Sequence, residues 1–278
     1  MPERVMELVA KAAPYLGKHG SGSPRLDAEL LLAEALGIGR MDLYLQFDRP
    51  LRGEEVDRFR ALCRRRAGGE PVAYIRGRRE FMSVDLLVTP AVMIPRPETE
   101  VLVEEALRLV GEGGCVLDVG TGSGAIAVAM AVHRPGCRVV AVDISAEALT
   151  VAAANVERLE LQDRVELRLA DLADGVEAPF DLVLANLPYI DPDWADAVTA
   201  EVRASEPALA LFGGRDGLEL VARLLEDLPR LLAPGGAALL ELDPRNARAA
   251  AALAGQRMGV PRLLQDLAGH DRVLVLQQ

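Results

Sequence analysis

The sequence predicts an α/β fold with a mostly parallel sheet, preceded by a small all-helical domain. Three observations support this prediction. The first 80 residues show helical patterns only, whereas short apolar runs alternate with helical stretches from residue 115 onward. A glycine-rich segment at residues 120–124 joins the first of those runs to the helix that follows it. Strands that alternate with helices are typical of parallel sheets covered by helices on both faces.

The amino-terminal part is expected to be a bundle of short helices over residues 1–79. Ser23 and Pro24 form a good helix start, because serine favours the N-cap and proline the first helical position. Gly37 is a suitable C-cap for that helix. Further helices are expected over residues 40–47 and from residue 54 to the glycine pair that begins at residue 68.

A linker is expected at residues 80–94. Residues 81–89 are rich in Val and Leu and alternate loosely, which predicts a hairpin, and three prolines at positions 90, 95 and 97 follow. The main domain is therefore expected over residues 95–278. After a helix at 99–110, strands are predicted at 115–119, 138–142, 165–169, 182–185, 237–242 and 272–276, and helices at 125–132, 146–158, 217–232 and 246–258.

Composition excludes several classes of protein. No apolar run approaches the roughly 20 residues of a membrane span, and no signal peptide is recognisable at the beginning. The three cysteines and three histidines are scattered without metal-like spacing. We therefore expect a cytoplasmic protein with no metal site and no histidine-centred nucleophile.

The charge is unevenly distributed. The net charge is −11, which argues against general nucleic-acid binding, but residues 1–80 hold 15 Lys and Arg against 12 Asp and Glu. Six arginines crowd the end of this basic part, and they are either a solvated helix face or a docking surface for a partner. They are Arg64, Arg65, Arg66, Arg76, Arg78 and Arg79.

One apolar run, residues 182–185, ends abruptly at Asn186, Leu187, Pro188 and Tyr189. Parallel strands deliver such residues to the carboxyl edge of the sheet, where α/β proteins bind ligands. The Asn186 side-chain carbonyl and the Leu187 backbone carbonyl are two adjacent acceptors, which suits a planar nitrogen with two N–H bonds. Tyr189 could stack on that group. The alternative is an Asn-Pro turn without a binding role.

The glycine loop suggests a second ligand. Gly120, Thr121, Gly122 and Gly124 allow close approach to a ligand at a helix amino terminus. With Ala125, the loop also fits the dinucleotide pattern G-x-G-x-x-A, so by itself it is ambiguous.

Acidic residues at successive strand ends narrow the choice of ligand. Asp118 could hold an ammonium group directly or through water, and Asp143, followed by Ile144, suits the hydroxyls of a ribose. Asp171 could accept from an adenine amine while Leu172 packs against the ring. Together they favour S-adenosylmethionine, which has a ribose and an amine but no phosphate. Each Asp could instead be a turn or cap residue.

Several longer motifs resemble those of the HemK/PrmC family, S-adenosylmethionine-dependent methyltransferases of peptide chain release factors. The match covers nearly the whole chain, and Ile94 to Glu100 is close to a family signature. Asn186 to Tyr189 resembles the family's Asn-Pro-Pro-Tyr motif. Residues 71–77, 79–81, 206–207, 211–218 and 266–269 also match.

The resemblance implies a five-helix bundle, a hairpin linker and a seven-stranded class I (Rossmann-like) methyltransferase domain. It implies that the glutamine of the Gly-Gly-Gln motif of release factors is methylated on its amide nitrogen. Arg96, Thr99, Glu100 and Asn186 would lie beside the cofactor. Met93 would cushion the substrate glutamine, held by Asn186, Leu187, Pro188 and Tyr189. No membrane and no direct nucleic-acid contact is expected.

Two departures from the family pattern leave alternatives open. Leu187 stands where the family usually has a second proline, so Asn-Leu-Pro-Tyr also resembles the motif of ribosomal RNA adenine dimethylases. The signature at residues 95–100 and the acidic main domain argue against an RNA substrate. The second departure is at Asp243-Pro244-Arg245, where the family more often has glycine. A nicotinamide-dependent oxidoreductase is a more distant alternative.

Overall fold

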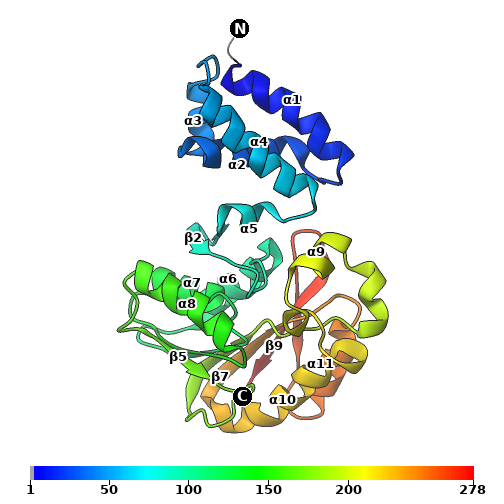
Figure 1. Ribbon diagram of the computed structural model, residues 1–278. Coiled ribbons are helices and arrows are strands. Elements are labelled where there is room, and N and C mark those ends of the chain that lie inside the picture. The colour runs from blue at the N-terminus through cyan, green and yellow to red at the C-terminus, as the bar shows by residue number, and fades with distance from the viewer. Residues whose placement is uncertain (1–2) are drawn as a thin grey trace. The chain divides into compact units, whose positions relative to one another are not determined.

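The computed structural model describes residues 3–278, which divide into two compact units at residues 78 and 79. The first unit contains helices, and the second contains a seven-stranded sheet with helices on both faces (Figure 1). This is the fold class that the sequence predicts, including the helical first part and the hairpin after it. Within residues 3–278, no helix is both long and apolar enough to cross a membrane.

Within residues 3–78, five helices form the first unit. Their apolar sides meet in one core, which includes the fully buried side chains of Leu31, Leu43 and Phe59. Proline at the first position and a left-handed Gly37 bound the second helix, as expected. The helices are α1 (Val5–Lys18), α2 (Pro24–Leu36), α3 (Arg40–Leu45), α4 (Gly53–Ala67) and α5 (Val72–Arg76).

Four of the six clustered arginines form ion pairs inside this unit. Arg66 Nε lies 2.7 Å from Asp27 Oδ2 in a buried pair that joins α4 to α2. Arg65 pairs with Glu70, and both Arg76 and Arg78 pair with Glu34. Much of the basic charge is therefore used within the bundle.

A hairpin of strands β1 (Arg78–Phe81) and β2 (Val84–Leu87) begins at the boundary. Its two turn residues, Met82 and Ser83, both have positive φ, as a tight hairpin turn requires. Phe81 and Leu86 are buried in the core of the second unit, so the hairpin packs against that unit.

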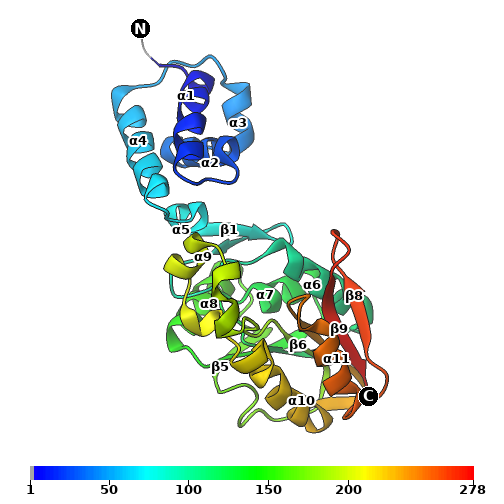
Figure 2. The ribbon, with the colours of Figure 1, turned by 90° about the vertical axis from the view of Figure 1, so that its right-hand side faces the viewer.

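The main sheet has the strand order β5-β4-β3-β6-β7-β9-β8. The first five strands in this order are parallel, and β9 runs antiparallel between β7 and β8 at one edge (Figure 2). The strands are β3 (Cys115–Val119), β4 (Arg138–Asp143), β5 (Val165–Leu169), β6 (Phe180–Ala185), β7 (Leu232–Glu241), β8 (Arg262–Gln265) and β9 (Asp271–Gln277).

Alternate residues of each central strand face opposite layers of helices. In β6, Leu182 and Leu184 pack on the side of α6 and α7, whereas Val183 and Ala185 pack on the side of α10 and α11. Burial on both faces explains why the strand sequences are almost continuously apolar. The helices are α6 (Glu100–Leu109), α7 (Ala125–His133), α8 (Ala146–Arg158), α10 (Glu219–Leu231) and α11 (Ala247–Gly255) (Figure 1).

Several short elements were not predicted from the sequence. A turn of 3₁₀ helix, η1 (Pro97–Thr99), precedes α6. Between β6 and α10 lie η2 (Pro192–Ala197), α9 (Ala200–Ser205), η3 (Ala208–Ala210) and η4 (Arg215–Gly217). Strand β8 was also missed, because it has only four residues and none of them is fully buried.

Candidate active site

A cavity lies at the carboxyl edge of β3, β4 and β6, where an open α/β sheet binds ligands. Most of the predicted site residues line it. They are Met93, Thr99, Gly120, Thr121, Gly122, Asp143, Ile144, Asp171, Leu172, Asn186, Leu187 and Pro188. The structure therefore brings together residues from five separate segments of the chain.

The glycine loop forms one wall of this cavity. The N–H groups of Gly120 and Thr121 both donate to the carbonyl of Val142 at the end of β4, at 2.9 and 3.0 Å. Gly120 has φ +75°, and a Cβ there would lie 3.1 Å from Leu187 Cδ2. Gly122 has φ +56° with open space where a Cβ would be, so the backbone is accessible to a ligand.

Asp143 links the end of β4 to this loop. Its Oδ2 accepts from the Gly122 N–H at 2.8 Å, and its Oδ1 accepts from the Ser145 N–H at 2.9 Å. Each carboxylate oxygen can accept a second hydrogen bond, so the group can still bind two hydroxyls from the cavity. The neighbouring Ile144 side chain is 53% exposed and lines the same cavity.

Asp171 and Leu172 follow β5 and line the far end of the cavity. Asp171 Oδ2 accepts from Arg223 Nη2 at 2.8 Å. The Leu172 side chain is buried, and its backbone has φ +51°, which is unusual for a leucine. Arg223 also lines the cavity and was not predicted, because an isolated arginine on a helix gives no sequence signal.

Asp118 lies beneath the loop instead of in the cavity lining. Its side chain is fully buried, and Oδ2 accepts from Thr121 Oγ1 at 2.6 Å and from the Ala127 N–H at 3.1 Å. Burial raises its pKa to about 7. The carboxyl group thus supports the loop and the start of α7, while its Oδ1 has no hydrogen-bond partner among the described residues. Its expected contact with an ammonium group, directly or through water, stays a prediction. Gly124, the N-cap of α7, also does not line the cavity.

Asn186 presents an acceptor to the cavity. Its Nδ2 donates to Thr99 Oγ1 at 3.0 Å, and Oδ1 accepts no hydrogen bond from the described residues. The Leu187 carbonyl likewise has no donor among residues 3–278. Two oxygens after β6 are therefore without a donor among the described residues, and their joint binding of a substrate N–H₂ group stays a prediction.

The backbone that follows these acceptors is held tightly by a glycine-rich loop. A Cβ on Gly213 would lie 2.1 Å from the Pro188 carbonyl oxygen, and one on Gly217 would lie 2.0 Å from the Tyr189 carbonyl oxygen. Asn246 Nδ2 also donates to the Tyr189 carbonyl at 3.2 Å. The position of the acceptor pair is thus fixed by residues far along the chain.

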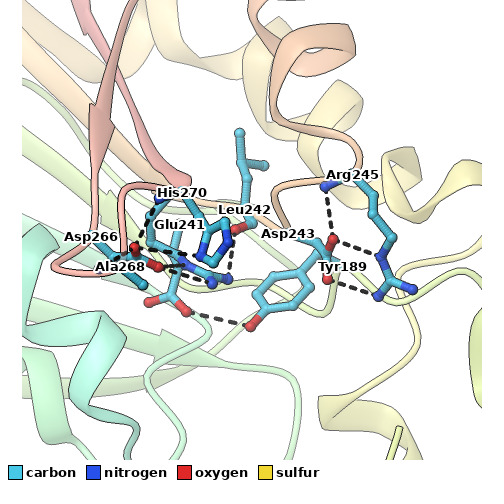
Figure 3. Close-up of polar contacts among 9 residues, drawn as sticks. Tyr189, Glu241, Leu242, Asp243, Arg245, Asp266, Ala268 and His270 are labelled. Atoms are coloured by element: carbon cyan, nitrogen blue, oxygen red, sulfur yellow. Dashed lines mark hydrogen bonds and ion pairs between the residues drawn. The ribbon is translucent and has the colours of Figure 1, made fainter. Parts of the chain in front are cut away.

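Tyr189 is not among the residues that line the cavity, and its expected stacking on the substrate stays a prediction. Its hydroxyl donates to Glu241 Oε1 at 3.4 Å (Figure 3). Burial raises the pKa of Tyr189, and burial also raises the pKa of Glu241 to about 7. Glu241 was not assigned to the site from the sequence. Its position at the end of an apolar run could have indicated a residue at the carboxyl edge of the sheet.

Arg96 and Glu100 are not among the residues that line the cavity, and both bond to other parts of the chain. Their expected position beside the cofactor stays a prediction. Arg96 forms an ion pair with the buried Glu206. Glu100 Oε1 accepts from the Met82 N–H at 2.9 Å and so holds the hairpin turn. Residues 3–278 contain no group of His, Cys, Asp and Glu suited to a metal ion.

Comparisons with known proteins add independent information. The chain matches the family model described as PrmC N-terminal domain over residues 7–77, and that described as methyltransferase small domain over residues 97–233. It is 46% identical to the release factor glutamine methyltransferase of Rhodopirellula baltica, covering 100% of this chain and 97% of the relative. It is 39% identical to the release factor glutamine methyltransferase of Chlorobaculum tepidum, with coverages of 99% and 98%.

Solved structures show the same fold at low identity. A methyltransferase from Pyrococcus furiosus superposes with a TM-score of 0.54 at 22% identity, covering 70% of this chain and 88% of that one. The 16S rRNA N2 G1207 methyltransferase of T. thermophilus, solved with AdoMet and guanosine, gives a TM-score of 0.55 at 20% identity. The coverages in that comparison are 72% and 49%.

Proposed function

The chain belongs to the release factor glutamine methyltransferase family, and we propose that the cavity after β3, β4 and β6 is where the methyl donor meets the substrate glutamine. The reaction is the transfer of a methyl group to a glutamine of a peptide chain release factor.

The donor set of the cavity fits S-adenosylmethionine. Asp143, which lines the cavity, would accept from ribose hydroxyls, and Asp171 and Leu172 would hold the adenine by one hydrogen bond and by apolar contact. The open space beside Gly122 would take the remainder of the molecule. Acids at two strand ends would repel a pyrophosphate, which argues against a dinucleotide. When bound, the cofactor supplies a methyl group on a positively charged sulfur that is also the leaving group.

The substrate side consists of the acceptor pair. A glutamine amide nitrogen is a weak nucleophile, because its lone pair is delocalised into the carbonyl. Asn186 Oδ1 and the Leu187 carbonyl accept its two N–H bonds and orient the nitrogen toward the methyl group. With the cofactor bound, the methyl group would pass from the sulfur to the nitrogen, and the nitrogen would then give one proton to solvent. No strong base is required.

Apolar residues complete the substrate side of the cavity. Met93 and Pro188 line it, and the half-exposed Leu209 lines it from the segment between α9 and η4. They can pack against the methylene groups of a glutamine side chain. We place the Gly-Gly-Gln glutamine of a release factor here. We also place the reaction in the cytoplasm, which agrees with three unpaired cysteines.

The orientation of Asn186 is the observation that carries this proposal. Because Nδ2 is engaged by Thr99, the free oxygen is an acceptor, which an N–H₂ substrate requires. Replacing Asn186 by Ala is expected to slow methyl transfer at least 100-fold, while S-adenosylmethionine binds with a Kd within about threefold of that of the parent protein.

The test is mass spectrometry of purified release factor after incubation with the protein and S-adenosylmethionine. One added methyl group on the Gly-Gly-Gln glutamine is expected. Asp143→Ala is the matched variant on the donor side, and it should weaken cofactor binding measured by calorimetry. Near-normal methylation by the Asn186→Ala variant, or methyl transfer to ribosomal RNA in place of release factor, would contradict the proposal.

A further inference from the structure

Arg223 is the only cation among the described residues that line the cavity. The other two charged side chains of that lining, Asp143 and Asp171, are acids. S-adenosylmethionine carries a net positive charge, because its sulfonium and ammonium groups outweigh its one carboxylate. A cation in the cavity wall would oppose such a ligand unless another group neutralised its charge. The position of Arg223 therefore needs an explanation.

Helix α10 brings Arg223 to the cavity, where it bonds to Asp171. Leu220 and Arg223 are three residues apart on α10, so they share one face of the helix, and both line the cavity. Nη2 of Arg223 donates to Asp171 Oδ2 at 2.8 Å. The charge of the arginine is thus balanced by the carboxylate that follows β5.

This ion pair is too exposed to act mainly in stabilising the fold. The side chain of Arg223 is 49% exposed, and that of Asp171 is 42% exposed. Ion pairs at such exposure contribute little to the free energy of unfolding, because water screens the charges and both side chains lose freedom. Since both members of the pair line the cavity, a role in binding a ligand accounts for it better.

The pair leaves one carboxylate oxygen of Asp171 available to the cavity. Oδ2 is engaged by Arg223, whereas Oδ1 accepts no hydrogen bond from the described residues. A half-exposed aspartate would otherwise turn between rotamers. A charge-assisted hydrogen bond at one oxygen restricts that rotation, so the other oxygen keeps one direction. The next residue, Leu172, is buried and lines the same cavity.

We propose that Arg223 is a positioning residue that fixes Asp171, so that Oδ1 accepts from the exocyclic amine of the adenine and the site selects adenine over hypoxanthine. This inference rests on the proposed placement of the adenine at Asp171 and Leu172. The adenine amine donates hydrogen bonds, whereas the oxygen at the same position of hypoxanthine accepts them. A carboxylate oxygen fixed at this point attracts the first group and repels the second. Selection between the two bases therefore depends on the direction in which Arg223 holds the carboxylate.

Calorimetric titration with two ligands tests this role. S-adenosylhomocysteine, the product left after methyl transfer, and S-inosylhomocysteine differ only in the base and carry the same charge. The ratio of their Kd values therefore reports recognition of the base, because any general effect of charge on binding cancels. The parent protein should bind the adenine compound at least about 10-fold more tightly, as expected for a hydrogen bond to a charged group.

Substitutions of Arg223 should change this ratio. Arg223→Met keeps an unbranched side chain but removes the guanidinium, and the two Kd values should then lie within about threefold of each other. Arg223→Lys can still donate to Asp171 Oδ2 and should restore a preference of about fivefold. A purely structural role for Arg223 would weaken both ligands alike and leave the ratio unchanged.

Arg168→Met is the matched control. Arg168 forms a comparably exposed pair with Glu166, with Nε 2.7 Å from Oε1, and it is not among the residues that line the cavity. The control loses the same charge and should keep the parent ratio. An unchanged ratio in Arg223→Met, or an equal loss of preference in Arg168→Met, would overturn the inference.

The Asp171→Ala variant separates this inference from the proposed function. If Asp171→Ala loses the preference for adenine while Arg223→Met keeps it, only the role of Arg223 is wrong. If the parent protein shows no preference, or if Asp171→Ala keeps it, the placement of the adenine is wrong as well.

Discussion

Replacing Gly213 by alanine is expected to slow methyl transfer by moving the acceptor pair, although Gly213 does not line the cavity. Gly213 packs directly against the backbone that follows Asn186 and Leu187. A Cβ at this position would lie 2.1 Å from the Pro188 carbonyl oxygen and 2.8 Å from the carbonyl carbon. Gly213 has an ordinary φ, so the substitution adds a contact without straining its own backbone.

The size of the effect follows from these distances. Cβ atoms in proteins keep at least 3.0 Å from a carbonyl oxygen, so the segment around Gly213 and the segment around Pro188 must move apart by roughly 1 Å. Hydrogen bonds hold them together: Ile190 N–H donates to the Leu211 carbonyl and Gly213 N–H to the Ile190 carbonyl, both at 3.0 Å. A misplacement of about 1 Å in a catalytic group can cost about 100-fold in rate, or about 2.7 kcal/mol in the barrier.

The assay is single-turnover methyl transfer to purified release factor with saturating cofactor. Gly111→Ala is the matched control, because its added Cβ meets no atom within 4 Å and its φ is also ordinary. Both variants should be folded by circular dichroism and should bind S-adenosylmethionine with a Kd within about threefold of normal. A folded Gly213→Ala variant with a rate within twofold of the control would refute the argument.

Three further predictions concern stability. Burial raises the pKa of Asp118 above its value in the unfolded chain, so the folded protein keeps this proton at pH values where the unfolded chain has lost it. As the pH rises from 5 to 6.5, the free energy of unfolding without cofactor should therefore fall by roughly 1 kcal/mol per pH unit. Asp118→Asn should remove that part of the slope in urea titrations, and an unchanged slope would contradict the assignment. Asn155→Ala should lower the free energy of unfolding by about 3 kcal/mol in the same titrations, because the buried Asn155 side chain forms hydrogen bonds with both the N–H and the carbonyl of Leu87. A loss below about 1 kcal/mol would contradict this role. Arg96→Ala leaves Glu206 buried without its cation and should cost about 3 kcal/mol, more at pH 8 than at pH 5, since burial already raises the pKa of Glu206. Equal losses at both pH values would show that the pair is not ionic.

Local sequence signals predicted the elements of the cofactor side closely. Strand β3 has the predicted bounds, because its apolar run lies between two glycines. Helix α8 also has the predicted bounds, and Ser145 caps it by accepting from the Ala148 N–H at 3.1 Å. Such signals lie within a few residues of the element that they define, so a sequence can reveal them without knowledge of the fold.

Features that depend on packing between distant segments were predicted less well. Strand β7 begins at Leu232, five residues before the predicted start at residue 237. The glycine pair at 235–236 does not end the strand, because the pairing with β6 continues across it with a shift in register after Phe180. Glu100 matches a family signature, yet its partner is the Met82 N–H in the hairpin. Arg96 and Glu206 are 110 residues apart in the sequence, so no local pattern predicts that they form a pair.

Strand β6 lies at the centre of the sheet, between the cofactor side and the substrate side of the site. Its neighbour β3 carries the glycine loop, while its other neighbour β7 carries Glu241 on the opposite side. An engineer who wishes to retarget the enzyme to a different side chain can therefore leave β3, β4 and β5 untouched. The changes belong in the segments after β6 and β7, which can be exchanged while the cofactor half is kept.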